Sequence, residues 1–262
     1  MAEGEDFLNL HVEGGLAILT VNRPRVLNSL SIAVLEEMRK ALRQLAQDRT
    51  VRVVVLTGAG DKAFIAGADI QEMLALTTTG MREFSRLGQE VTNLLQAMSK
   101  VTIAAINGYA LGGGFELALA CDIRIASDEA QIGLPEVSLG IFPGFGGTQR
   151  LPRLVGRGKA AELIFTGERV DAIEAERIGL VNKVVPSENL MEEVKKLAEA
   201  ILARGPISVR VAKEAMNRAD EVGLGAGLQY EREAFGQIAG TKDKEEGMRA
   251  FVEKRKPEFK GE

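Results

Sequence analysis

The first part of the chain shows both hydrophobic periods that regular secondary structure produces. "FLNLHVEGGLAILTVNRP", residues 7–24, alternates apolar and polar residues on either side of two glycines, which predicts a β-hairpin that ends at the proline. Apolar residues then recur at helical spacing after the N-cap residue Ser31, at Leu35, Met38, Leu42 and Leu45. This pattern predicts a helix to about residue 48. The β-branched run "VRVVVLTG" predicts a strand buried on both faces.

The order of strand and helix continues through the middle of the chain. A helical pattern covers residues 81–98, the strand "VTIAAING" follows, and a glycine run with its own helix precedes the strand "DIRIAS". Because strands alternate with helices, the fold class is α/β with mainly parallel crossovers. A strand–strand–helix unit recurs, although the sequence contains no repeat of fixed period.

The pattern changes after Pro186, because the remaining segments all predict helices with no strand between them. We therefore expect a core over residues 1–195 and a C-terminal helical region over residues 196–262. The last helices carry apolar faces, with little chain left to cover them. These faces pack either against another subunit, as in an oligomerisation region, or back onto the core of the same chain.

Composition and charge exclude several classes of protein. The chain has 262 residues, of which 45% are hydrophobic and 27% charged, and its formal net charge is −4. This composition is typical of a globular protein, and the charge gives no general attraction to nucleic acid or anionic lipid. The acidic start lacks the features of a signal peptide, and no run approaches the ~20 apolar residues of a membrane span. A cytoplasmic protein without membrane contact is expected.

The reactive side chains are few. Cys121 is the single cysteine and lies in an apolar run, so an internal disulfide is excluded and a buried thiol is expected. His11 is the single histidine. No metal site and no pair of nucleophile and histidine can be built from these two residues, so neither a metal nor a cofactor is expected.

One apolar helix contains an unexpected carboxylate. In "YALGGGFELALACD", residues 109–122, three glycines stand where a buried strand leads into a helix, and Glu116 follows them. The first N–H groups of a helix have no internal partner and can bind a negative charge. The run is neither a dinucleotide-binding G-x-G-x-x-G loop nor a P-loop, since no Gly-Lys-Ser/Thr follows. A tight packing turn remains the alternative to a binding site.

Two further stretches extend this candidate site. "KAFIAGADIQEM", residues 62–73, supplies a second turn of small residues after a buried strand, so two turns could aim two N–H groups at one oxygen, as in an oxyanion hole. "QIGLPEVSLGIFPGFGGTQRL", residues 131–151, carries Glu136 among apolar residues. Either glutamate alone fits a structural salt bridge or hydrogen bond. Together, beside glycine-rich backbone, they indicate an acid–base pair.

These stretches resemble a known family. "AGADIQEM", "INGYALGGGFELALACDIRIAS" and "LPEVSLGIFPGFGGTQRLPRLVG" are closely similar to the crotonase superfamily, and within it to the enoyl-CoA hydratases. The likeness runs from "RPRVLNSL" near the start to "EGMRAFVEKRKPEF" near the end. It implies a spiral of strand–strand–helix (ββα) turns, followed by helices that build a homotrimer or a dimer of trimers.

The resemblance also implies roles for individual residues. The backbone N–H groups of Ala68 and Gly113 would form the oxyanion hole that holds the thioester carbonyl of a coenzyme A substrate. Glu116 would hold and activate water, and Glu136 would exchange the proton at Cα. Gly144 would place a backbone N–H near this water and the second glutamate.

A larger set would bind the coenzyme A part of the substrate, which is not a separate cofactor: Arg25, Val26, Lys62, Phe64, Ala68, Asp69, Ile70, Gln71 and Gly113. Gln71 stands where some relatives carry lysine, which puts a phosphate contact in doubt, and Lys62 fits a solvated lysine equally well. Phe115, Leu134 and Ile141 are expected to exclude bulk water, either as the acyl pocket or as plain core. Phe259 and Lys260 would reach the nucleotide of a neighbouring subunit.

The expected activity is the reversible addition of water to a 2-trans-enoyl-CoA. A Δ3,Δ2-enoyl-CoA isomerase is the nearest enzymatic alternative, and it ordinarily needs one carboxylate. An RNA-binding role, known for one crotonase relative, would need a clustered basic face with interleaved aromatic residues, and the chain has scattered basic pairs and no tryptophan. Acyl chain length and metabolic pathway stay open, because the segment 74–84 that would form one pocket wall has no readable conformation.

Overall fold

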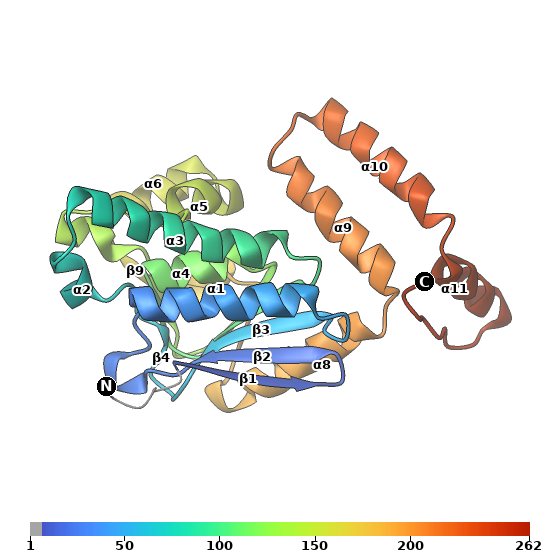
Figure 1. Ribbon diagram of the computed structural model, residues 1–262, viewed down its shortest axis with the longest axis horizontal. Coiled ribbons are helices and arrows are strands. Elements are labelled where there is room, and N and C mark those ends of the chain that lie inside the picture. The colour runs from blue at the N-terminus through green and yellow to red at the C-terminus, as the bar shows by residue number, and fades with distance from the viewer. Residues whose placement is uncertain (1–6) are drawn as a thin grey trace.

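A computed structural model describes residues 7–262 of the chain (Figure 1). Its ten strands are β1 (Leu8–Glu13), β2 (Leu16–Val21), β3 (Val53–Gly58), β4 (Ala63–Ile65), β5 (Val101–Ile106), β6 (Tyr109–Leu111), β7 (Ile123–Ser127), β8 (Gln131–Gly133), β9 (Arg169–Asp171) and β10 (Lys183–Val185). Its α-helices are α1 (Ile32–Gln47), α2 (Ile70–Leu74), α3 (Thr78–Ala97), α4 (Gly113–Ala120), α5 (Gly147–Val155), α6 (Arg157–Thr166), α7 (Ala172–Arg177), α8 (Leu190–Leu202), α9 (Pro206–Ala219), α10 (Leu224–Ile238) and α11 (Lys242–Glu253).

The strands form two sheets that the chain visits in turn. The larger sheet has the order β1-β2-β3-β5-β7-β10 and the smaller one β4-β6-β8-β9. All neighbours are parallel except β1 with β2 and β8 with β9. Each unit, β3 with β4, β5 with β6 and β7 with β8, gives one strand to each sheet and then enters a helix. This arrangement confirms the expected α/β spiral of ββα turns.

Local sequence explains where the first elements begin and end. Gly14 and Gly15 have φ of 58° and 90°, the positive values that a tight two-residue hairpin turn requires. The hydroxyl of Ser31 accepts a hydrogen bond from the N–H of Val34 at 3.2 Å and caps α1 as expected. Every residue of β3 is buried, because helices cover both faces of this part of the large sheet.

The core has two layers of apolar side chains, one on each face of the large sheet. The larger layer lies between this sheet, the small sheet and the helices α1, α3 and α4. The second layer joins Val53, Val55 and Ile103 to Leu190 and Val194 of α8. Because α8 covers the sheet as far as Leu202, the expected boundary at residue 195 falls inside a core helix. The helices that leave the sheet begin with α9.

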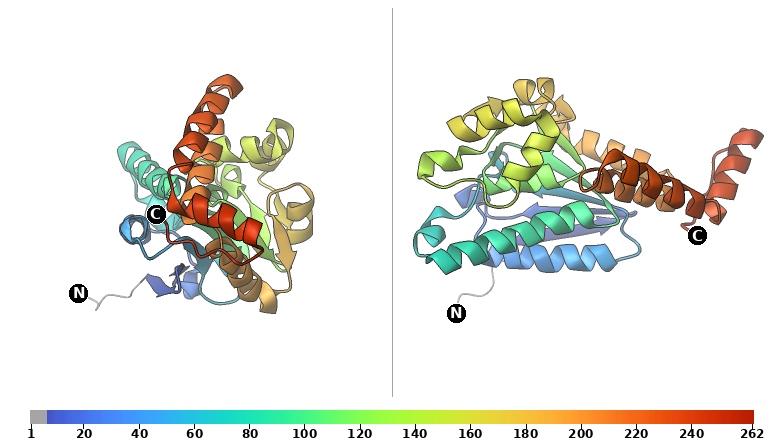
Figure 2. Two further views of the ribbon diagram at one scale, coloured as in Figure 1. Left: turned by 90° about the vertical axis from the view of Figure 1, so that its right-hand side faces the viewer. Right: turned by 90° about the horizontal axis from the view of Figure 1, so that it is seen from above.

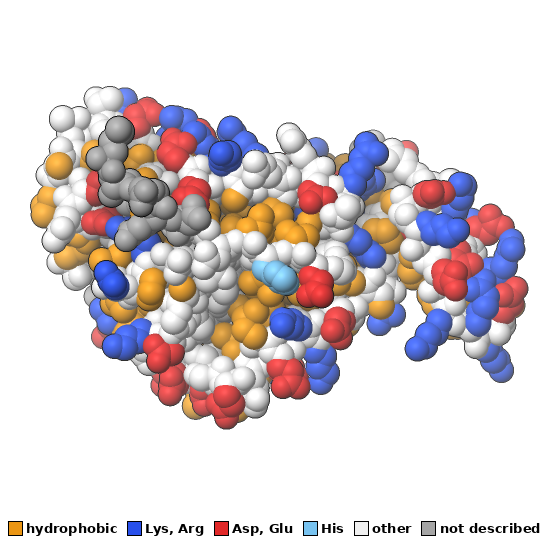
Figure 3. Space-filling model, turned by 60° about the horizontal axis from the view of Figure 1, so that its bottom comes forward, with side chains coloured by type: hydrophobic (Ala, Val, Ile, Leu, Met, Phe, Trp, Pro, Cys, Tyr) orange, Lys and Arg blue, Asp and Glu red, His pale blue; other side chains and the backbone are white. Residues whose placement is uncertain are grey.

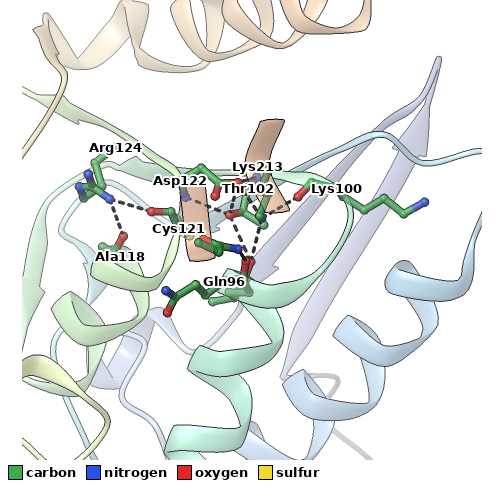
Figure 4. Close-up of polar contacts among 10 residues, drawn as sticks. Gln96, Lys100, Thr102, Ala118, Cys121, Asp122, Arg124 and Lys213 are labelled. Carbon is green, nitrogen blue, oxygen red and sulfur yellow. Dashed lines mark hydrogen bonds and ion pairs between the residues drawn. The ribbon is translucent and has the colours of Figure 1, made fainter. Parts of the chain in front are cut away.

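Helices α9 to α11, which we call the arm, project from one end of the molecule (Figures 1 and 2). Helix α9 packs along α10. Its Lys213 is 7% exposed and donates from Nζ to Asp122 Oδ2 at 2.8 Å and to the carbonyl oxygen of Lys100 at 2.8 Å (Figure 4). The arm is therefore joined to the core by an ion pair whose lysine is buried and whose aspartate is partly exposed.

None of the helices between residues 7 and 262 has the length and apolar character that a membrane crossing requires. In the described part of the chain, no three His, Cys, Asp or Glu side chains come together in a way that could hold a metal ion. Cys121 is buried, and its burial raises the pKa of the thiol to about 12. The thiol is therefore inert at neutral pH, as its apolar surroundings predict.

Candidate active site

The glycines that open α4 make room for two different neighbours. Gly112 has φ of 51°, and a Cβ there would lie 3.2 Å from Oε1 of Glu136. A Cβ on Gly114 would lie 2.0 Å from the carbonyl oxygen of Ile65, which no real contact permits. The glycine run therefore lets α4 start directly against β4 and lets a carboxyl group approach its first turn.

The two expected oxyanion donors lie at the ends of neighbouring strands. β4 and β6 are paired in parallel, and a Cβ on Gly67 would lie 3.4 Å from the carbonyl oxygen of Leu111, so the turns that follow these strands touch. Gly113 is the first residue of α4, and its N–H has no acceptor within the helix. Within residues 7–262, neither this N–H nor that of Ala68 donates to another protein group. Both are free to bind a substrate oxygen.

Glu116 lies in the first turn of α4 and is 1% exposed. Its Oε1 accepts hydrogen bonds from the backbone N–H of Gly147 at 2.6 Å and of Phe145 at 2.8 Å. Burial raises the pKa of this carboxyl group to about 7, although the two N–H groups and the charge of Arg150 act in the opposite direction. Glu116 can therefore gain and lose a proton near neutral pH.

Glu136 lies in the 3₁₀ helix Pro135–Leu139, and its carboxyl group approaches Gly112, the residue just before α4. It is 9% exposed, and among the described residues its buried Oε2 has no hydrogen-bond partner. Burial and, after it, the negative charge of Glu116 raise the pKa of Glu136 to about 7. The two carboxyl groups therefore influence each other, so one can be ionised while the other keeps its proton.

Gly144 holds its turn in place through its carbonyl group. This oxygen accepts hydrogen bonds from Ser85 Oγ at 2.7 Å and from Gln89 Nε2 at 3.0 Å. The expected role of the Gly144 N–H stays a prediction. The N–H groups that bind Glu116 belong to Phe145 and Gly147 instead, which sequence reasoning missed. The glycine-rich "FPGFGG" was the available signal, since such runs often turn several N–H groups the same way.

Several residues expected at the coenzyme A site share one exposed region. Arg25, Val26, Lys62, Ile70 and Gln71 are all exposed. Buried Asn28 donates to the carbonyl oxygens of Ala59 at 3.0 Å and Ala63 at 2.8 Å. These bonds tie the segment of Arg25 and Val26 to the loop that carries Lys62.

Two other residues expected to bind coenzyme A, Phe64 and Asp69, stabilise the fold. The ring of Phe64 is fully buried in the core, so this residue offers a ligand only its backbone. Asp69 accepts from the N–H of Glu72 at 3.4 Å, which caps α2, and its other oxygen lies 3.4 Å from Arg23. Phe115 and Leu134 are also buried, whereas Ile141 is partly exposed.

Phe259 and Lys260 line a cavity of about 570 Å³ beside the start of α9, together with Arg49, Arg52, Lys100 and Arg210. This cavity lies at the amino ends of β3 and β5. The two glutamates lie at the opposite, carboxyl ends of the strands. Within one chain, these two tail residues therefore do not reach the site of the glutamates, and their expected contact with a neighbour's nucleotide stays a prediction.

Taken together, these residues define a class of enzyme. Two buried carboxyl groups that titrate near neutrality lie beside free backbone N–H groups, an arrangement for acid–base chemistry on a substrate that develops negative charge on an oxygen. The chain belongs to the enoyl-CoA hydratase/isomerase family, whose model matches residues 11–262.

Similar proteins cover nearly the whole chain. A short-chain-enoyl-CoA hydratase of Clostridium acetobutylicum is 50% identical over 249 residues, which is 95% of each chain. A crotonyl-CoA hydratase of Syntrophomonas wolfei is 50% identical over 250 residues, 95% of this chain and 96% of the other. The crystal structure of an enoyl-CoA hydratase from Bacillus anthracis is 46% identical, with a TM-score of 0.95 over 98% of this chain and 100% of the other.

Proposed function

We propose that the protein is an enoyl-CoA hydratase, which adds water reversibly and on one face to a 2-trans-enoyl-CoA to give a 3-hydroxyacyl-CoA. The observation that carries this proposal is the pair Glu116 and Glu136, both buried and both with a pKa of about 7. Hydration needs one group to take a proton from water and another to give one to carbon. An isomerase moves a single proton and needs one carboxylate, so the pair favours hydration.

The backbone donors act on the thioester. Addition at Cβ pushes negative charge onto the carbonyl oxygen, which becomes an enolate-like oxyanion. The N–H groups of Ala68 and Gly113 are free to bind this oxygen. Each preorganised donor of this kind is worth on the order of 10²–10³ in rate.

The carboxyl groups divide the proton transfers. Oε1 of Glu116 is held by two backbone N–H groups, which leaves Oε2 to bind the reacting water and take its proton while the hydroxyl adds to Cβ. Glu136 keeps its proton and gives it to Cα. The proton taken up by Glu116 then returns to Glu136 through solvent, which restores the starting state. Such acid–base help contributes roughly 10²–10⁴ in rate.

The relatives' names support a short acyl chain. Two proteins that are 50% identical are named short-chain-enoyl-CoA and crotonyl-CoA hydratases, so crotonyl-CoA is the substrate proposed first. Its coenzyme A part would lie along Arg25, Val26, Lys62 and the turn from Ala68 to Gln71. Coenzyme A enters as part of the substrate, and we propose no separate cofactor.

We propose that the working form is a homo-oligomer, a trimer or a dimer of trimers, built through the arm. Exposed apolar side chains along α10 and α11, such as Phe235 at 76% and Phe251 at 85%, support this assembly. The net charge of −4 does not favour nucleic acid as a partner. The single cysteine, which cannot pair within the chain, supports a reducing compartment such as the cytoplasm.

The test uses two substrates that differ in the position of one double bond. A hydratase lowers the absorbance of the conjugated thioester of crotonyl-CoA and releases 3-hydroxybutyryl-CoA, which mass spectrometry identifies as a gain of one water. An isomerase instead raises this absorbance with 3-butenoyl-CoA. Rapid hydration with slow isomerisation supports the proposal. Inertness toward crotonyl-CoA and longer 2-enoyl-CoA substrates, with rapid isomerisation, would overturn it.

A further inference from the structure

We propose that a polar stripe on α3, formed by Ser85, Gln89 and Thr92, acts with Arg150 to orient the backbone N–H groups that bind Glu116. These are positioning residues, since they contact the turn of residues 144–147 and not the substrate site. The effect of these residues on the rate of hydration rests on the proposed hydratase function. Their effect on the pKa of Glu116 does not.

The stripe has the spacing of one helix face. Its residues stand at positions i, i+4 and i+7 of α3. Ser85 Oγ and Gln89 Nε2 donate to the carbonyl oxygen of Gly144 at 2.7 and 3.0 Å. Thr92 Oγ1, which is buried, donates to the carbonyl oxygen of Phe145 at 2.9 Å. Arg150 Nη1 lies 3.2 Å from the same oxygen. Each of these two carbonyl groups therefore has two donors.

Because the peptide group is planar, fixing the direction of a carbonyl group also fixes the direction of the next residue's N–H. In a planar trans peptide the C=O of one residue and the N–H of the next point to opposite sides. When the Gly144 carbonyl is held toward α3, the N–H of Phe145 must point away from α3, where it meets Glu116 at 2.8 Å. The Phe145 carbonyl likewise directs the N–H of Gly146 toward Glu116, and this N–H also lowers the carboxyl pKa.

The resulting run of N–H groups forms an anion-binding nest. Residues 145 and 147 donate their N–H groups to one oxygen of Glu116, and the N–H of Gly146 between them also lowers the pKa of this carboxyl group. Gly146 has φ of 111°, in the left-handed region that lets successive N–H groups converge. The nest favours the ionised form of Glu116, which is the form that takes a proton from water.

Packing holds the turn close to the stripe. A Cβ on Gly88, within the same face of α3, would lie 2.2 Å from the ring of Phe145, so this glycine lets the ring enter. The ring also packs against the ring of Phe84 in a tilted arrangement, with ring centroids 5.3 Å apart and an angle of 55° between the ring planes. On its other side, a Cβ on Gly113 would lie 2.9 Å from the same ring. Phe145 thus connects α3 to the residue that carries an oxyanion donor.

The decisive variant is Ser85→Ala/Gln89→Ala, which removes both donors to the Gly144 carbonyl. This peptide can then rotate, and Glu116 loses the Phe145 N–H. Because a hydrogen bond to the ionised form lowers a carboxyl pKa, its loss raises that pKa. We expect the titration midpoint of Glu116 to rise by about one unit. Infrared difference spectroscopy measures it through the protonated C=O band that is missing from Glu116→Gln.

The pH dependence of kcat should shift in the same direction as the pKa of Glu116. For hydration of crotonyl-CoA, the acid limb of the kcat profile should move to higher pH by about the same one unit, and kcat at pH 7 should fall about fivefold. KM should change less than about twofold, since no substrate contact is removed. Ser85→Thr, which keeps the hydroxyl, should restore the wild-type profile in the presence of Gln89.

Gln149→Ala is the matched control, because Gln149 is exposed and its side chain donates only to Thr148. It should leave both readouts at wild-type values. A double variant with an unchanged midpoint for Glu116 overturns the proposal, as does a loss of activity that is equal at every pH. If the midpoint shifts while the wild type fails to hydrate any enoyl-CoA, the positioning role stands and the hydratase proposal falls.

Discussion

At the scale of single residues, the proposed active site differs from other buried polar groups in how its hydrogen-bonding atoms are satisfied. Arg124 is also buried, at 6% exposure, but it donates to the carbonyl oxygen of Leu180 at 2.8 Å. It also donates to the carbonyl oxygen of Cys121 at 2.7 Å (Figure 4). Its charge thereby stabilises the C-terminus of α4. Glu136 has no such partner for its buried oxygen among the described residues. A buried carboxyl group left in this state costs stability, which is typical of a functional group.

This cost predicts a gain in stability when the carboxyl group is removed. The pKa of Glu136 is about 7, against an ordinary value of 4.5. The folded state thus binds the proton more tightly than the unfolded state, and stability falls as pH rises from about 4.5 to 7. Glu136→Gln should therefore raise the free energy of unfolding by about 2–3 kcal/mol at pH 8.

Denaturant unfolding at pH 8 and pH 5 measures this difference. At pH 5 the wild-type carboxyl group is already protonated in the folded state, so the gain should shrink to below about 1 kcal/mol. A gain of the same size at both pH values would show that it does not arise from ionisation of Glu136.

At the scale of elements, α4 carries Glu116, one of the two proposed catalytic residues, at its first turn and is anchored at its last. Asp122, just beyond the helix, accepts from the N–H of Thr102 at 2.7 Å and from its hydroxyl at 3.0 Å. The same oxygen binds Lys213 of α9 (Figure 4). The end of α4, the start of β5 and the first helix of the arm therefore meet at one ion pair.

The ion pair predicts a large effect for one substitution. Lys213→Met leaves the Asp122 carboxylate without its cation, and the carbonyl oxygen of Lys100 without the ammonium donor, in a partly buried place. The free energy of unfolding should fall by about 2–3 kcal/mol. Lys196→Met is the control: this lysine is 76% exposed and pairs with Glu193 at 3.4 Å, so its loss should cost less than about 1 kcal/mol. Equal losses in the two variants would refute a special role for the pair of Lys213 and Asp122.

Regular elements could be predicted from sequence because each has a periodic signal. The alternation around Gly14-Gly15, the helical spacing after Ser31 and the continuous β-branched run each correspond to an element in the structure. The two glutamates could be singled out because a carboxylate in an apolar segment breaks the pattern. Both proved to be buried beside the glycines.

Two other features, the nest at residues 145–147 and the end of the core, leave no pattern in the local sequence. The nest at residues 145–147 depends on the direction of peptide planes, which α3 sets from a segment some fifty residues earlier in the chain. Residue 195 was a natural boundary in a run of helices, but α8 has an apolar face that fits the second face of the large sheet. That contact joins segments distant in sequence, so periodicity alone cannot predict it.

At the scale of the whole molecule, the exposed apolar side chains of the described residues include two groups outside α11 that bear on assembly. One is a stripe on α10, formed by Leu224, Leu228 and Phe235, which are 80%, 54% and 76% exposed. The other lies on β1, where Leu10 and Val12 are 46% and 43% exposed, and Figure 3 shows hydrophobic side chains gathered around the histidine on this face. Exposed apolar patches of this kind mark surfaces that associate. Two separate surfaces are what a dimer of trimers would need.

The stripe on α10 gives a prediction for assembly. If the protein is the proposed homo-oligomer, Leu228→Asp/Phe235→Asp places two charges on the stripe and should convert it to a monomer of 28.2 kDa. Gln229→Asp is the matched control, since Gln229 is exposed on the same helix but points to another face. Light scattering coupled to size exclusion measures both. An unchanged mass for the double variant would exclude the stripe from the interface.

The central claim is that two carboxyl groups share the hydration of an enoyl-CoA. It is tested most directly by the rate of crotonyl-CoA hydration in wild type, Glu116→Gln and Glu136→Gln, with binding of the substrate measured in parallel. Each substitution should lower kcat at least about a hundredfold while the Kd for crotonyl-CoA changes only a few-fold. If either variant keeps more than about a tenth of the wild-type kcat, the corresponding glutamate does not carry a proton in the reaction, and the two-carboxylate mechanism is wrong.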